Sequence, residues 1–85
     1  MTVRSFNQWK AEAALRLLAI KAAHKDDQRI RQTIDVLLTR LQYLRVRDLP
    51  SFLVLMHHAA ALTDEFLSVL PTEEEIQEWF KGGEE

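Results

Sequence analysis

Residues 30–44 read IRQTIDVLLTRLQYL, and the spacing of their apolar positions decides the fold class. The large apolar side chains recur at intervals of four, three, four and three residues, at Ile30, Ile34, Leu37, Leu41 and Leu44. This spacing follows the 3.6-residue period of an α-helix and places one continuous apolar stripe along one side of it. The stretch therefore predicts an amphipathic helix, which we expect over about 27–46.

A capping signal on the N-terminal side predicts another helix. Ser5 and Gln8 have the spacing of a capping box, in which each side chain accepts a hydrogen bond from an otherwise unpaired backbone N–H group. We therefore expect a helix over about 6–24. Asp27 then offers a carboxylate to the free N–H groups at the start of the central helix, so a turn separates the two.

Two prolines divide the second half of the chain. Pro50 disfavours helix in the residue before it and suits the first turn of the next helix, which we expect over about 49–70. Pro71 ends that helix, and a second capping box at 72–75 predicts a short helix over about 73–81.

The composition is typical of a single helical domain. The chain has 85 residues, of which 47% are hydrophobic, with two Gly and two Pro. No segment alternates apolar and polar residues as a β-strand does, and the joints between the predicted helices are short. Short joints favour antiparallel neighbours. We therefore predict an all-α fold over 1–85, an antiparallel bundle of three long helices with a short C-terminal fourth helix.

Several classes of protein are disfavoured by what the sequence lacks. Without cysteine, neither disulfides nor thiolate metal sites can form. No apolar run approaches the ~20 residues of a transmembrane helix, and the first residues do not resemble a secretion signal. We therefore expect a cytoplasmic protein without a membrane partner.

The charges are divided between the two halves of the chain. Residues 1–47 hold ten Lys or Arg and four Asp or Glu, whereas residues 48–85 hold one and nine, although the net charge is only −2. Complementary halves favour one docking of the helices over others, but exposed ion pairs contribute only about 0–1 kcal/mol each. The same division could orient a dimer or attract a partner protein.

Two predicted helices carry more apolar surface than a small bundle covers. For the helix over 49–70, the expected core face is Leu49, Phe52, Leu53, Met56, Ala60, Thr63, Leu67 and Leu70. A second stripe lies beside it: Leu55, Leu62, Phe66 and Val69. Either the short C-terminal helix or a second chain could cover this stripe.

The helix over 6–24 has a second stripe of its own, made of Ala11, Leu15, Leu18 and Ala22. If the C-terminal helix covers the stripe of the helix over 49–70, no lid is left for this one. Two-faced helices of this kind predict a homodimer or a helical partner.

No cluster of side chains indicates a catalytic or metal site. His57 and His58 precede Asp64 and Glu65 by seven residues, whereas paired ligands on one helix are three or four residues apart. The only glycines are the pair near the C-terminus, which excludes a phosphate-binding loop and a nucleophile elbow. We therefore expect no enzymatic activity, no metal and no cofactor.

A candidate contact face lies on the central helix outside its core stripe. It holds Arg40, Tyr43 and Arg47, and Arg and aromatic side chains are frequent hot spots of protein interfaces. We expect a non-enzymatic protein–protein interaction module, a small adaptor, inhibitor or regulatory subunit that self-associates. Its expected partner-binding residues are Leu55, Leu62, Phe66 and Val69 as an apolar anchor, with Arg40, Tyr43 and Arg47 as a polar and aromatic set.

A nucleic-acid-binding regulator is the alternative. Arg29, Arg40 and Arg47 fall on one side of the predicted central helix beside Tyr43, and such arginines can hold phosphates while the ring stacks on a base. The whole domain is acidic, however, and nucleic-acid binding usually goes with a basic surface. The sequence therefore favours a protein partner over a nucleic acid.

Overall fold

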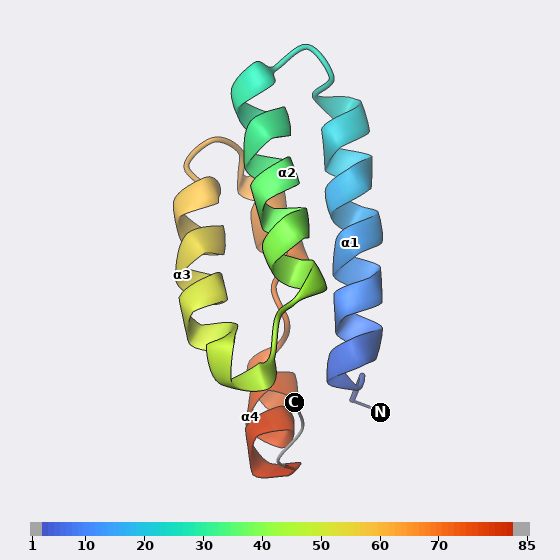
Figure 1. Ribbon diagram of the computed structural model, residues 1–85, viewed down its shortest axis with the longest axis vertical. Coiled ribbons are helices and arrows are strands. Elements are labelled where there is room, and N and C mark those ends of the chain that lie inside the picture. The colour runs from blue at the N-terminus through green and yellow to red at the C-terminus, as the bar shows by residue number, and fades with distance from the viewer. Residues whose placement is uncertain (1–2, 83–85) are drawn as a thin grey trace.

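The computed structural model describes residues 3–82, and this part of the chain is helical and contains no β-strand. In chain order, its elements are α1 (Phe6–Ala23), α2 (Gln28–Gln42), the 3-10 helix η1 (Val46–Asp48), α3 (Leu49–Ala59), the 3-10 helix η2 (Asp64–Val69) and α4 (Glu73–Gly82). In Figure 1, α1 and α2 lie side by side and run in opposite directions, and α3 lies on the other side of α2. Behind α2, η2 contacts both α1 and α3, and α4 lies at one end of the molecule.

Capping hydrogen bonds set the starts of the first two helices. Ser5 Oγ accepts a hydrogen bond from the backbone N–H of Gln8 at 3.1 Å, and Gln8 Oε1 accepts one from the N–H of Ser5 at 2.9 Å. At the start of α2, Asp27 Oδ1 accepts from the N–H of Ile30 at 3.2 Å. These bonds satisfy backbone donors that the helices leave unpaired, as the sequence predicts.

One side of each helix contributes to a shared core. Its buried apolar residues are Phe6, Trp9, Ala13, Leu17, Ile20, Ile30, Ile34, Leu37, Leu41, Leu44, Val46, Leu49, Phe52, Met56, Ala59, Phe66, Val69 and Trp79. α2 ends at Gln42, four residues before the expected end, and the turn that follows brings Leu44 and Val46 into this core.

The end of the molecule that α4 covers is built from aromatic rings. Phe6, Trp9, Phe52 and Trp79 form an aromatic cluster, with ring centroids 5.3 Å apart for Phe6 and Trp79 and 5.6 Å apart for the two tryptophans. Both indole N–H groups are satisfied, since Trp9 donates to the carbonyl of Val69 at 2.9 Å and Trp79 to that of Arg4 at 2.8 Å. The cluster therefore joins both ends of the described chain in one packed unit.

A buried ion pair holds α4 in place beside this cluster. Arg4 Nε and Nη2 donate to the two carboxylate oxygens of Glu75 at 2.6 and 2.8 Å, and Glu75 is only 4% exposed. The same carboxylate accepts from the N–H of Thr72 at 2.9 Å, which completes the predicted capping box of α4. Its hydrogen bonds with Arg4 hold the pKa of Glu75 below its usual range.

The helix expected over 49–70 is interrupted in the structure. α3 ends at Ala59, and Thr63 adopts extended backbone angles, φ −159° and ψ 131°. The hydroxyl of Thr63 caps the next segment by accepting from the N–H of Glu65 at 3.4 Å. The chain then returns along α1 as η2. The expected third long helix is therefore a shorter helix followed by a 3-10 helix that packs on α1.

Candidate interaction surfaces

The expected apolar anchor consists of Leu55, Leu62, Phe66 and Val69, and these four residues do not lie on one surface in the structure. Phe66 and Val69 are core residues, 0% and 3% exposed, so their side chains offer no surface to a partner. Leu62 is half-buried in the turn before η2, and Leu55 is half-buried on α3. The expectation of one exposed stripe is therefore wrong for Phe66 and Val69, because the break after α3 turns both onto α1.

Three of the seven expected partner-binding residues meet in a groove between α2 and α3, which we call the α2–α3 groove. Its volume is about 430 Å³, and it is lined by Thr39, Arg40, Tyr43, Leu44, Asp48, Ser51, Phe52 and Leu55. Leu44 and Phe52 are buried, whereas the Tyr43 ring is 74% exposed. The groove thus combines apolar side chains with an exposed arginine and tyrosine at its rim, the residue types that favour protein contacts.

Arg47 lies outside this groove. Because α2 ends at Gln42, Arg47 belongs to η1 and does not continue the helical face of Arg29 and Arg40. Exposed Arg40 and Arg47 form no ion pair with any residue among 3–82. Neighbouring Arg45, which the sequence reasoning did not single out, is also exposed and has no ion pair within the same range.

Two hydrogen-bonded pairs of side chains join the two halves of the described chain, and the division of Lys and Arg from Asp and Glu accounts for one of them. One joins Arg4 to Glu75, and the other joins His24 Nε2 to Glu65 Oε1 at 2.5 Å. The hydrogen bond with His24 lowers the pKa of Glu65. Together these pairs hold α4 and η2 against the N-terminal half of the fold, and only the pair of Arg4 with Glu75 comes from the division of charges.

The second apolar stripe of α1 is not covered by any part of the described chain. We call Ala11, Leu15, Leu18 and Ala22 the outer stripe. Leu15 is 69% exposed and Leu18 is 49% exposed, and both alanines are exposed as well. The opposite side of α1 is fully used by the core through residues such as Trp9 and Leu17. α1 is therefore apolar on two sides, of which one faces solvent.

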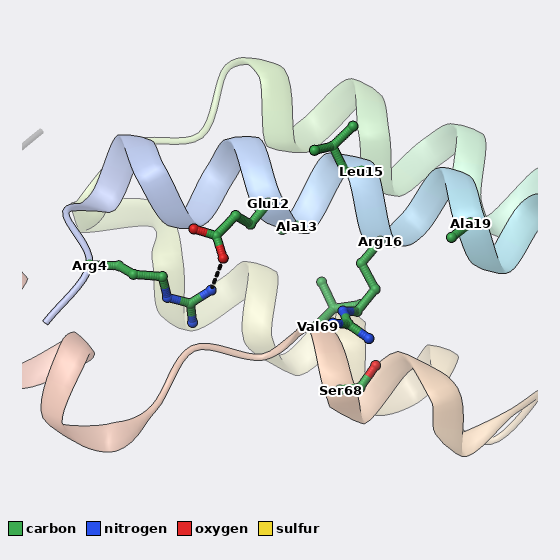
Figure 2. Close-up of a pocket in the computed structure, with 8 residues that line it drawn as sticks. All are labelled: Arg4, Glu12, Ala13, Leu15, Arg16, Ala19, Ser68 and Val69. Atoms are coloured by element: carbon green, nitrogen blue, oxygen red, sulfur yellow. Dashed lines mark hydrogen bonds and ion pairs between the residues drawn. The ribbon is translucent and has the colours of Figure 1, made fainter. Parts of the chain in front are cut away.

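A second groove runs beside the outer stripe, between α1 and η2. It encloses about 440 Å³ and is lined by Arg4, Glu12, Ala13, Leu15, Arg16, Ala19, Ser68 and Val69. Figure 2 shows Arg16 reaching toward Ser68 and Val69, whereas Leu15 points away from them. Arg4 Nη1 donates to Glu12 at 3.1 Å, so its guanidinium is shared between Glu12 and Glu75. Charged side chains therefore border the outer stripe on this side.

The histidines that attracted attention in the sequence do not assemble a site. His57 Nδ1 lies 2.8 Å from the carbonyl oxygen of Leu53 in its own helix. Across 3–82, no group of three or more His, Asp or Glu side chains is arranged to hold a metal ion. None of the helices described is both long and apolar enough to cross a membrane.

The chain matches no protein-family model, no curated protein and no solved structure.

Proposed function

We propose that this protein is a non-enzymatic helical interaction module that associates with a second copy of itself through α1. The observation that supports the proposal is the outer stripe, two half-exposed leucines and two alanines on a helix whose other side is already buried. Burying a fully exposed leucine contributes about 1.5–3 kcal/mol, so removing Leu15 and Leu18 from water favours association. A folded monomer provides nothing within 3–82 that does so.

The α2–α3 groove gives the module a second surface for another protein. It lies on the side of α2 away from α1, so a dimer formed through α1 leaves it open on each copy. Arg40, Tyr43 and Leu55 suit a partner that offers an acidic side chain next to an apolar one. A small adaptor, inhibitor or regulatory subunit would use the two surfaces in this way.

A protein partner suits this groove better than a nucleic acid does. Buried Leu44 and Phe52 contribute apolar surface to it, and the carboxylate of Asp48 lines it as well. A phosphate backbone requires several cations in a row, whereas Arg29 and Arg47 do not line the groove with Arg40.

We further propose that α1, α2 and α3 form an antiparallel bundle, in which the third helix is shortened and α4 lies at one end. The proposal also keeps the cytoplasm as the expected compartment of the protein.

Replacing Leu15 with glutamate is expected to shift the protein from dimer to monomer. The added carboxylate would have to be buried between two apolar faces, which is costly for an unpaired charge. Light scattering on a sizing column, over a hundredfold range of concentration and at low and high salt, measures the molar mass. The wild-type dimer is expected to persist at high salt, because apolar contacts are not screened.

Val54→Glu is the matched control for this experiment. Val54 is 56% exposed on α3, away from the outer stripe, so this variant should keep the wild-type mass and helix content. A wild-type protein with the mass of one chain at every concentration would contradict the proposal. A dimer lost at high salt would assign the contact to charged residues instead.

A further inference from the structure

The outer stripe of α1 has the same order of residue types and the same spacing from either end. Its members, Ala11, Leu15, Leu18 and Ala22, are separated by four, three and four residues, with alanine at each end and leucine in the middle. All four lie on the exposed side of one uninterrupted helix. A surface that binds a second copy about a two-fold axis has to be complementary to itself, and a palindromic stripe meets this requirement.

We infer that two copies pair their α1 helices antiparallel, with Ala11 facing the second copy's Ala22 and Leu15 facing its Leu18. This inference rests on the proposed self-association and specifies its geometry. Facing alanines let the two backbones approach closely at both ends of the contact, and facing leucines fill its centre. The spacing of four, three and four residues is also that of a helix seam that packs knobs into holes.

The width of the outer stripe fits one helix. On one side, Lys10 and Lys21 turn away from the outer stripe. Lys10 Nζ donates to the carbonyl of Leu44, just after α2, at 2.9 Å. Lys21 Nζ pairs with Asp35 of α2 at 2.7 Å. On the other side, Glu12 and Arg16 border the groove next to η2. Between these charged borders the apolar surface consists of the outer stripe with Ala14 and Ala19 beside it, and its width suits one further helix.

Of the charged border residues, Glu12 bears on the register, whereas the two Arg16 side chains lie at nearly the same height in the inferred pairing and reach toward η2 instead. In the inferred pairing, position 12 of one copy lies at the height of position 21 of the other. The Glu12 residues of the two copies are therefore nine residues apart along the helix axis. That distance is about 13 Å along the axis at 1.5 Å per residue. It exceeds the screening length of about 8–10 Å at moderate salt.

Other arrangements of the two helices are less favourable. A register shifted by seven residues, with Ala11 facing Leu15, would bring the two Glu12 carboxylates to within about 3 Å along the axis. It would also leave Leu18 and Ala22 without apolar partners. A parallel pairing would place like ends of the two helix dipoles side by side, whereas the antiparallel pairing places opposite ends together.

The contact area sets the expected strength of the dimer. The outer stripe spans residues 11–22 and is therefore about 18 Å long, and a helix is about 10–12 Å wide, so each copy contributes roughly 200 Å². Stable interfaces bury about 800 Å² on each partner, and smaller ones belong to weak, reversible complexes. We therefore expect a weak dimer that dissociates on dilution.

Engineered cysteines test which positions face one another, and the natural chain contributes no background because it has no cysteine. Ala11→Cys and Ala22→Cys are prepared separately, and both sites are exposed, so each variant should keep the fold. Mild oxidation of each protein alone and of their mixture is followed on non-reducing gels. A disulfide requires Cα atoms about 4.4–6.8 Å apart. The mixture is expected to form covalent dimer at least tenfold faster than either variant alone.

The outcomes separate the geometry from the self-association itself. If Ala11→Cys links to itself as fast as it links to Ala22→Cys, the antiparallel register is overturned while the dimer stands. If the wild type is a dimer by light scattering and no pair links above an Ala11→Cys and Val54→Cys control, α1 is not the contact. A wild type that is monomeric at every concentration overturns both the geometry and the proposed function.

Discussion

Replacing Phe66 with alanine is expected to lower the free energy of unfolding by about 3–5 kcal/mol, the usual cost of truncating a buried aromatic side chain. Phe66 is 0% exposed and lies in η2 between α1 and α3. An 85-residue domain has a total stability of roughly 4–13 kcal/mol, so this loss would remove a large part of it. Urea unfolding followed by circular dichroism measures the difference.

The neighbouring residue provides the matched control. Leu67 is 46% exposed, so Leu67→Ala is expected to cost less than about 1 kcal/mol. A continuous helix over 49–70 predicts the reverse order of the two losses, because it places Leu67 on the core face of that helix and Phe66 on the second apolar stripe beside it. A larger loss for Leu67→Ala than for Phe66→Ala would therefore show that the helix is not interrupted after Ala59.

Replacing Arg4 with alanine is expected to destabilise the protein by about 2–3 kcal/mol, because the Glu75 carboxylate would be left buried without its charged partner. This range lies below that of a fully buried pair because the Arg4 side chain is 33% exposed. The backbone carbonyl that accepts from Trp79 remains in the variant, so the change reports on the ion pair. Glu12→Gln is the control, since Glu12 is 58% exposed and should cost less than about 1 kcal/mol.

The same ion pair makes stability depend on pH in a defined direction. Its bonds to Arg4 lower the pKa of Glu75 in the folded protein, so the folded state binds fewer protons than the unfolded chain at acidic pH. The stabilisation is complete above the unfolded pKa of about 4.3 and is lost as pH falls through the lower folded value. Glu65 contributes in the same direction through His24.

Unfolding titrations between pH 7 and pH 3 test this dependence. The wild type should lose stability as the pH falls, and Arg4→Ala should lose less, because Glu75 then lacks its charged partner and keeps only the hydrogen bonds with Thr72 that lower its pKa. The difference between the two proteins reports on the carboxylates that pair with Arg4, which are buried Glu75 and exposed Glu12, since the pair of Glu65 with His24 is present in both. Parallel curves for the two proteins would show that Arg4 does not stabilise the charged form of Glu75.

Local signals in the sequence were sufficient to place the starts of α1, α2 and α4. Each start depends on side chains within three residues of the backbone donors that they satisfy, as Ser5, Asp27 and Thr72 do. The break after α3 also had a local signal, because Thr63 precedes two acidic residues at the start of η2. The prediction did not use that signal: it followed the helical periodicity and placed Thr63 on the core face of one helix over 49–70.

Periodicity alone was less reliable for the candidate surfaces. It identified both apolar faces of α1, because helical geometry fixes which residues share a side of one helix. It could not show that Arg40 and Tyr43 meet Leu55 in one groove, since this depends on how α2 and α3 pack. It also assigned Arg47 to a helix that ends at Gln42.

Short-range chemistry in the sequence was therefore enough to establish an all-helical chain, the starts of three helices and the two apolar sides of α1. Only tertiary packing decided that Phe66 and Val69 belong to the core and that the outer stripe of α1 is left uncovered. The physical reason is that burial depends on residues far apart in the sequence. η2 buries Phe66 and Val69 by packing on α1 and α3. Trp79 and the pairing of Glu75 with Arg4 hold α4 at the aromatic cluster, away from the outer stripe.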